Sequence, residues 1–169
     1  MCMDNPNRPG SVKPDQPALE ISTLKRREIQ SPLIASLLRG FINEIGYPKA
    51  MAIASAAIQN DAIQVGKRMA ENGGNTMQDL LRVIRESWAA ENALEFTVLE
   101  ETDQRLSFDV TRCRYAELYA RQGIKEFGCC LSCDRDAPLI ESFNPRMKLL
   151  RTQTIMQGAA LCDFRIIME

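Results

Sequence analysis

Cysteines and carboxylates recur in the last third of the chain. They stand at Cys113, Cys129, Cys130, Cys133, Asp134, Asp136, Cys162 and Asp163. Histidine is absent from all 169 residues. Any catalysis or metal binding must therefore use thiols, carboxylates, guanidinium groups, amides and hydroxyls. This excludes Ser-His-Asp and Cys-His catalysis and all histidine-based zinc sites.

The thiols are open to three interpretations. Cys130 and Cys133 have the C-x-x-C spacing of zinc sites and redox dithiols, although a second such pair and a βαβ context are both missing. A zinc site drawn from separate elements is the first alternative, and its ligands would be Cys113, Cys130, Cys133 and Cys162. The second alternative is a small buried hydrophobic residue, which we expect of Cys129. The third is a nucleophile in a pocket.

Strand geometry separates neighbouring residues near the C-terminus. Because side chains alternate between the two faces of a strand, Cys162 points away from Asp163 and Arg165. Cys162 therefore belongs with the apolar residues of its strand. Asp163 and Arg165 have two possible roles, which are contact with a ligand and pairing with each other across the sheet surface.

Two further polar residues are candidates for ligand binding. Arg151 lies in an otherwise apolar strand, where its guanidinium needs either a ligand carboxylate or a carboxylate of the chain. Asn144 precedes Pro145, which is typical of a turn, and a binding role for its amide is the alternative. The sequence contains no glycine-rich phosphate-binding loop, which disfavours a nucleotide-dependent enzyme.

The first half of the chain shows apolar residues at helical spacing. The first helix is predicted to begin at Ser31, an N-cap followed by proline, and to end at Gly46. An alanine-rich helix follows from Pro48. A third begins at Thr76, whose capping box is completed by Asp79.

The second half alternates apolar with polar residues, which predicts strands. The strands are expected near 96–98, 106–110, 147–156 and 161–168, with helices at 115–127 and 138–143. The predicted fold class is α+β: an N-terminal helical layer packed on a roughly four-stranded antiparallel sheet with inserted helices.

Length and composition fit one domain, since 45% of the residues are hydrophobic. We expect a single α+β domain over residues 31–169, with a helical part at 31–91 and a cysteine-containing sheet part at 92–169. The proline-bearing residues 1–30 are expected to form a flexible arm.

The charge balance indicates the kind of partner. The 21 basic and 22 acidic residues give a net charge of −1, so we expect binding neither to nucleic acid nor to a membrane surface. No apolar run approaches the roughly 20 residues that cross a bilayer, and no apolar signal core is present. We therefore expect a cytoplasmic protein with free thiols that binds a small molecule. The alanine-rich helix offers a surface for a homodimer.

Several spaced elements together resemble the L-2-amino-thiazoline-4-carboxylic acid hydrolase family. They are Cys113 with Tyr115-Ala116-Glu117, Cys133 to Asp136, Phe143-Asn144-Pro145, Arg151-Thr152, Gly158 and Cys162-Asp163-Phe164-Arg165. The resemblance spans roughly residues 92–168. It implies a bacterial hydrolase that opens a cyclic amidine ring and converts L-2-amino-thiazoline-4-carboxylate to N-carbamoyl-L-cysteine. It also implies kinship with small ligand-binding domains of the vinyl-reductase type. Leu161 departs from the family pattern, because that pattern has a more polar residue at this position.

This reaction does not require histidine. A thiolate can attack the amidine carbon and expel the ring sulfur, because a thiol with a pKa of about 8.5 is a good leaving group. We assign the nucleophile to Cys133 and the binding of amidinium or water to Asp136, since three-residue spacing puts both on one helical face. Arg151 would hold the substrate carboxylate, and Cys162 is a second catalytic candidate. The remaining substrate-binding candidates are Asn144, Cys113 and Asp163.

Two other classes of protein stay open. A non-enzymatic, sensor-like domain would use the same pocket to bind a small molecule or a metal. A zinc-stabilised interaction module would bind metal stoichiometrically and unfold with a chelator. The hydrolase is expected to need no cofactor, except in the variant where zinc held by the thiols activates water.

Overall fold

An antiparallel sheet of four strands organises the molecule. The computed structural model describes residues 21–169 and gives the strand order β1-β2-β4-β3. The strands are β1 (Leu94–Glu101), β2 (Arg105–Cys113), β3 (Met147–Leu150) and β4 (Cys162–Met168). All neighbouring strands are antiparallel. The predicted α+β class is therefore confirmed.

One face of the sheet is apolar and carries the main core. Leu106, Phe108 and Val110 of β2 are buried, as the period of two predicted. Phe108 lies opposite Phe164 of β4, and their rings stack with centroids 4.6 Å apart. Alternation along β4 is confirmed as well, because Cys162, Phe164 and Ile166 are buried while the residues between them are not.

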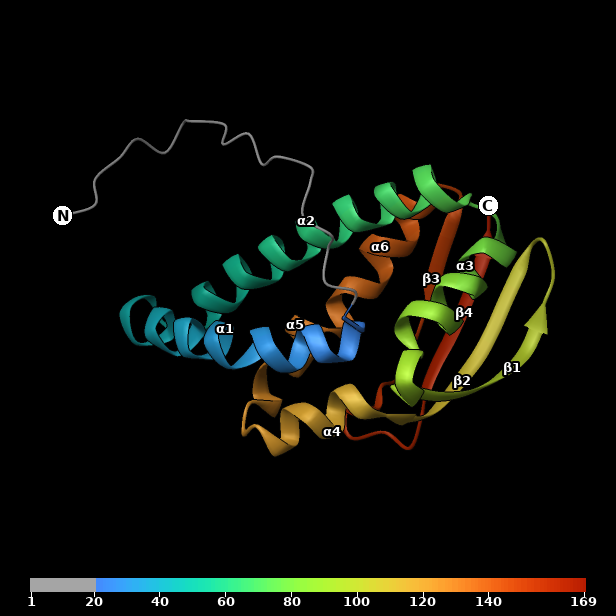
Figure 1. The fold of residues 1–169 in the computed structure, drawn as a ribbon. Coiled ribbons are helices and arrows are strands. Elements are labelled where there is room, and N and C mark those ends of the chain that lie inside the picture. The colour runs from blue at the N-terminus through green and yellow to red at the C-terminus, as the bar shows by residue number, and fades with distance from the viewer. Residues whose placement is uncertain (1–20) are drawn as a thin grey trace.

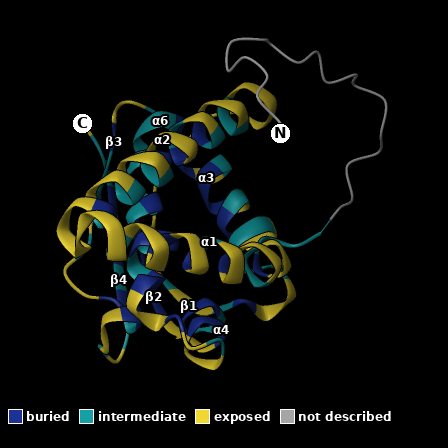
Figure 2. Ribbon diagram, turned by 90° about the vertical axis from the view of Figure 1, so that its left-hand side faces the viewer, coloured by how far each residue is buried: buried dark blue, intermediate teal, exposed yellow. Residues whose placement is uncertain are grey.

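Helices cover this apolar face (Figure 1). Helices α1 (Thr23–Ile45) and α2 (Tyr47–Gly73) form a long hairpin whose tip extends beyond the sheet, and its outer surface is largely exposed (Figure 2). Helix α3 (Met77–Val83) has the predicted capping box of Thr76 and Asp79. Helix α6 (Asp136–Phe143) packs between α2 and the sheet.

A second core lies beneath α1. It is built by α4 (Arg114–Arg121), α5 (Gly128–Leu131) and the segment between them. One-turn helical segments complete the chain at Ile84–Trp88, Ala90–Asn92, Lys125–Phe127, Cys133–Arg135 and Ile155–Gln157. Within residues 21–169, no helix combines the length and the hydropathy that a membrane span requires.

The predicted start of the first helix is wrong. Helix α1 begins at Thr23, capped by the Ser22 hydroxyl, and Pro32 lies inside it. Proline has no N–H to donate to the carbonyl four residues earlier, that of Glu28. The Gln122 side chain supplies the missing donor: its Nε2 donates to that carbonyl at 3.0 Å, and its Oε1 accepts from Ser31 at 2.7 Å. The prediction of a flexible arm is therefore wrong for residues 23–30. Residues 1–20 of this arm lie outside the part of the chain that the structure describes.

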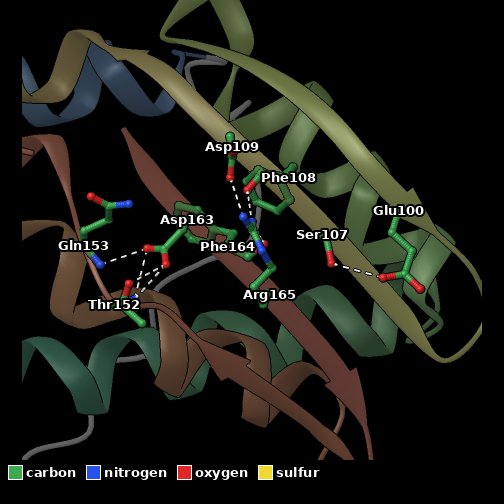
Figure 3. Close-up of polar contacts among 9 residues, drawn as sticks. All are labelled: Glu100, Ser107, Phe108, Asp109, Thr152, Gln153, Asp163, Phe164 and Arg165. Carbon is green, nitrogen blue, oxygen red and sulfur yellow. Dashed lines mark hydrogen bonds and ion pairs between the residues drawn. The ribbon is translucent and has the colours of Figure 1, made fainter. Parts of the chain in front are cut away.

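The predicted third strand is shorter than expected. It ends at Leu150 and does not continue to residue 156. Two and three residues further on, the backbone N–H groups of Thr152 and Gln153 donate to the carboxylate of Asp163 at 3.0 and 2.8 Å (Figure 3). A side chain thus replaces the backbone partner, and the chain leaves the sheet. The predicted turn at Gly158 is present, with φ of 100°.

Candidate functional site

A cavity of about 500 Å³ lies between the apolar face of the sheet and helices α1, α2 and α6. This volume is typical of pockets for small molecules. Five of the candidate residues line it, namely Cys113, Cys133, Asp136, Arg151 and Cys162. Residues up to 49 positions apart in the sequence are thereby brought together, because β2, β4 and the start of α6 converge at one end of the sheet.

Arg151 and Asp136 form an ion pair in this cavity. Nη1 of Arg151 donates to the Asp136 carboxylate, and Nη2 donates to the Cys133 carbonyl at 3.0 Å. The guanidinium also lies 5.0 Å from the centroid of the Phe164 ring. The two side chains are only 15% and 19% exposed. Of the two interpretations of Arg151, the structure shows pairing with a carboxylate of the chain.

Asp136 is poised to exchange a proton near neutral pH. Burial raises the pKa of its carboxyl to about 6, while the neighbouring Arg151 opposes the shift by favouring the charged form. A carboxylate with such a pKa is largely ionised at pH 7 and is a stronger base than an exposed aspartate. It therefore suits general base catalysis.

The thiols of the cavity are protonated at neutral pH. Burial raises the pKa of Cys133 strongly, and the negative charge of Asp136 raises it further. Burial also raises the pKa of Cys113 to about 11. The pKa of Cys162 is raised by burial too, although its sulfur accepts a hydrogen bond from the Ile155 N–H at 3.2 Å. A nucleophilic cysteine here needs a base to remove its proton.

Aromatic rings form part of the wall. Trp88, Tyr115 and Phe164 all line the cavity. The Tyr115 hydroxyl donates to the Trp88 carbonyl at 2.9 Å, which fixes α4 against the segment that follows α3. The sequence analysis did not assign Trp88 to the site, because nothing in its own helical segment marks it as a ligand contact.

One end of the cavity, called its mouth below, is charged and is lined by Arg27, Gln30, Asp61 and Arg135. Arg135 is buried and donates to Asp61 at 2.7 Å. Arg27 stands beside this pair and is half-buried. A second hollow of about 390 Å³ shares Arg27, Gln30, Asp61 and Arg135 with the cavity. None of these residues was assigned to the site from the sequence, because Arg27 and Gln30 fall in the predicted flexible arm, Asp61 falls in a helix interpreted as scaffold, and Arg135 was given no role of its own.

Two candidates for substrate binding lie elsewhere. Asp163 is on the opposite face of the sheet, where it binds Thr152 and Gln153 (Figure 3). On the same face Arg165 forms a salt bridge with Asp109 at 2.8 Å. The alternative in which Arg165 pairs with Asp163 is therefore wrong in its partner.

Asn144 also lies outside the cavity. Its amide donates to the Asn75 carbonyl and accepts from the Arg146 N–H, at 2.9 and 3.0 Å. It therefore holds the turn before β3, as the Asn-Pro dipeptide indicated.

The four thiols of the zinc alternative are not gathered. Cys130 is buried away from the cavity that Cys113, Cys133 and Cys162 line. In the part of the chain that the structure describes, no three acidic or cysteine side chains are grouped so as to hold a metal ion. The C-x-x-C spacing does not translate into a shared ligand geometry, because Cys130 and Cys133 belong to different short helices.

The structure is an α+β fold with a cavity of a size typical of small-molecule pockets. The chain belongs to the L-2-amino-thiazoline-4-carboxylic acid hydrolase family, whose pattern matches residues 26–166. This match includes α1 and α2 as well as the sheet part on which the resemblance was first seen. No curated protein matches the chain.

The solved structures that match the chain include two proteins with little sequence identity to it. One is the phenol-responsive sensory domain of the transcription activator PoxR with phenol, at 8% identity and a TM-score of 0.51, covering 80% of this chain and 73% of that one. The other is a trafficking protein particle complex subunit 3 from Naegleria fowleri covalently bound to palmitic acid, at 11% identity and a TM-score of 0.48, covering 84% and 96%. At such identities the likeness concerns the fold alone.

Proposed function

We propose that the protein is a hydrolase that opens a small cyclic amidine, with L-2-amino-thiazoline-4-carboxylate as substrate and N-carbamoyl-L-cysteine as product. Membership of the family supports the substrate. One observation carries the proposal: a thiol, Cys133, and a carboxylate with a raised pKa, Asp136, line the same cavity of about 500 Å³. These two groups can supply a nucleophile and its base.

The first half of the reaction forms a bond to the protein. Asp136 accepts the proton of the Cys133 thiol, and the positive charge of the bound amidinium favours the thiolate. The sulfur attacks the amidine carbon to give a tetrahedral intermediate. The bond from this carbon to the ring sulfur then breaks, and the ring sulfur leaves with the electron pair and receives the proton from Asp136. An isothiourea on Cys133 remains.

The second half releases the product. Asp136 accepts a proton from water, and the resulting hydroxide attacks the same carbon. The sulfur of Cys133 leaves with the electron pair and recovers its proton. One water is consumed, nothing is oxidised or reduced, and the product carries a urea group and a free thiol.

Arg151 takes a different role from the one first assigned to it. Because two of its nitrogens bind Asp136 and the Cys133 carbonyl, we propose that it positions both groups and keeps the carboxylate largely ionised. The Cys133 segment and the start of α6 are thereby tied to the end of β3. A substitution of Arg151 would thus affect catalysis through Asp136.

A non-enzymatic binding domain is the second candidate function. The aromatic wall and the protonated thiols would suit a ligand that is held without reaction. The fold of the PoxR sensory domain is compatible with such a role. This candidate predicts saturable binding with no change in the ligand.

Incubation of the reduced protein with L-2-amino-thiazoline-4-carboxylate tests the proposal. Thiol release is followed with a chromogenic disulfide, and the product mass is determined on the same sample. The hydrolase proposal predicts many turnovers, with one new thiol and one added water per product. Saturable binding without any thiol release would contradict it and would favour the binding domain.

A further inference from the structure

The cavity has more positive charge than the protein as a whole. Five arginines and three carboxylates line it, which gives a net charge of +2, whereas the whole chain carries −1. They are Arg26, Arg27, Arg68, Arg135, Arg151, Asp61, Glu86 and Asp136. Such a cavity attracts an anionic ligand, because partly desolvated charges are less well screened than charges in bulk water.

Two of the three partly buried arginines are already paired with carboxylates. Arg151 binds Asp136, and Arg135 binds Asp61. The side chain of Arg27 forms no ion pair or hydrogen bond with any group in residues 21–169, although the residue is half-buried. Arg26 and Arg68 also lack ion pairs there, but both are exposed to solvent.

Arg27 also lies at the mouth of the cavity. It lies where the cavity of about 500 Å³ meets the outer hollow of about 390 Å³, beside the pair of Arg135 and Asp61. Two guanidinium groups therefore stand at the mouth beside a single carboxylate, which binds only one of them. A second carboxylate would balance the charge there, and a guanidinium can bind it through two parallel hydrogen bonds.

We infer that Arg27 is the anchor for the carboxylate of a small ligand, and that it selects carboxylate-bearing rings over rings that lack a carboxylate. This inference rests on the proposed function in taking a cyclic amidine as the ligand. The ring then lies with its carboxylate at the mouth, at Arg27, and its amidine towards Asp136 and Cys133. A zwitterionic ring is thereby oriented by one charge at each end.

Binding is tested with two rings that differ only in the carboxylate: L-2-amino-thiazoline-4-carboxylate and 2-amino-thiazoline. Trp88 is the single tryptophan and lines the cavity, so its fluorescence reports binding by stopped flow before turnover. The wild type should bind the carboxylate at least about tenfold more tightly. Arg27→Gln should weaken the binding of L-2-amino-thiazoline-4-carboxylate about 10- to 100-fold and leave the affinity for 2-amino-thiazoline unchanged.

Two variants serve as controls. Arg27→Lys keeps the charge but loses the paired hydrogen bonds, so part of the preference should return. Arg39→Gln removes an exposed arginine from the same helix, away from the cavity, and should leave the preference unchanged. Thermal melts check folding, and Arg27→Gln should melt near the wild type because the Arg27 side chain makes no hydrogen bond or ion pair within residues 21–169.

The inference is overturned if Arg27→Gln keeps the preference, or if the wild type shows no preference or binds neither ring. Loss of the preference in Arg151→Gln alone would transfer the anchor to Arg151 and also overturn it. Turnover is scored separately. If L-2-amino-thiazoline-4-carboxylate binds through Arg27 but its ring is never opened, the hydrolase proposal is contradicted, whereas the role of Arg27 as carboxylate anchor is not.

Discussion

At the scale of single residues, the chemistry depends on how Asp136 and Cys133 share protons. Burial raises the pKa of both groups and Arg151 opposes both shifts, so the carboxyl, which is intrinsically the more acidic of the two, remains so. The resting state is therefore a neutral thiol near a carboxylate. The substrate cation is what makes transfer of the thiol proton favourable.

The pH dependence of kcat/KM follows from this arrangement. Asp136 acts as a base only when ionised, so kcat/KM should rise with pH through a limb near pH 6, where its carboxyl titrates. Below that pH the carboxyl is protonated and activity is lost. Asp136→Asn should lower kcat about 100-fold or more and remove the limb.

Asp134→Asn is the matched control, because Asp134 lies two residues away but does not line the cavity. It should keep both the rate and the limb. A wild-type rate that stays constant from pH 4.5 to 7.5 would contradict the assignment of Asp136 as base.

At the scale of elements, the site depends on how closely α6 approaches α2. Gly66 is buried in the contact, and a Cβ there would collide with Ser142 and with the carbonyl of Leu139. Since a backbone carbonyl cannot rotate away, α6 would have to shift. Asp136 opens α6, so this contact helps to position the base.

Gly66→Ala should lower the free energy of unfolding by about 1–3 kcal/mol and lower activity with it. The measurement is chemical denaturation followed by Trp88 fluorescence. Gly40→Ala in α1 is the control, because no atom lies within 4 Å of the added Cβ. It should be neutral or should stabilise by up to about 1 kcal/mol. Equal effects of the two substitutions would argue against the packing role of Gly66.

Local patterns predicted the elements best where the local signal and the tertiary structure agree. The capping box of Thr76 and Asp79, and the alternation along β2 and β4, are of this kind. The start of α1 could not be predicted, because the side chain that compensates for Pro32, Gln122, lies 94 residues from the carbonyl that it satisfies. The end of β3 was missed for the same reason, since Asp163 acts from another strand.

The candidate site was predictable only in part. Cys133, Asp136 and Arg151 were identified because their residue types are chemically unusual in their segments. Arg27 and Trp88 carry no such mark, and only the packing of α1 and of the segment Ile84–Trp88 against the sheet places them at the cavity.

At the scale of the whole molecule, a ligand that fills the cavity links both cores. The lining includes residues of α1, α2, α6 and the sheet, so a bound ligand should stabilise all of them together. The homodimer expected from the sequence stays a prediction.

Ligand-linked stabilisation should be visible in thermal melts. A ligand at 100 times its dissociation constant adds about 2.7 kcal/mol, which corresponds to a rise in Tm of about 5–10 °C for a domain of this size. L-2-amino-thiazoline-4-carboxylate should produce this rise, and an acyclic amino acid such as alanine should not. Equal shifts with the two compounds would count against a specific cavity.

The central claim is that the Cys133 sulfur forms a bond to the amidine carbon of the substrate. Acid quenching during turnover, followed by intact mass spectrometry and peptide mapping, tests it most directly. The account predicts an adduct on Cys133 with the full mass of the substrate, lost together with turnover in Cys133→Ser but retained in Cys130→Ser, whose thiol lies outside the cavity. Undiminished turnover by Cys133→Ser, or an adduct on another cysteine, would contradict it.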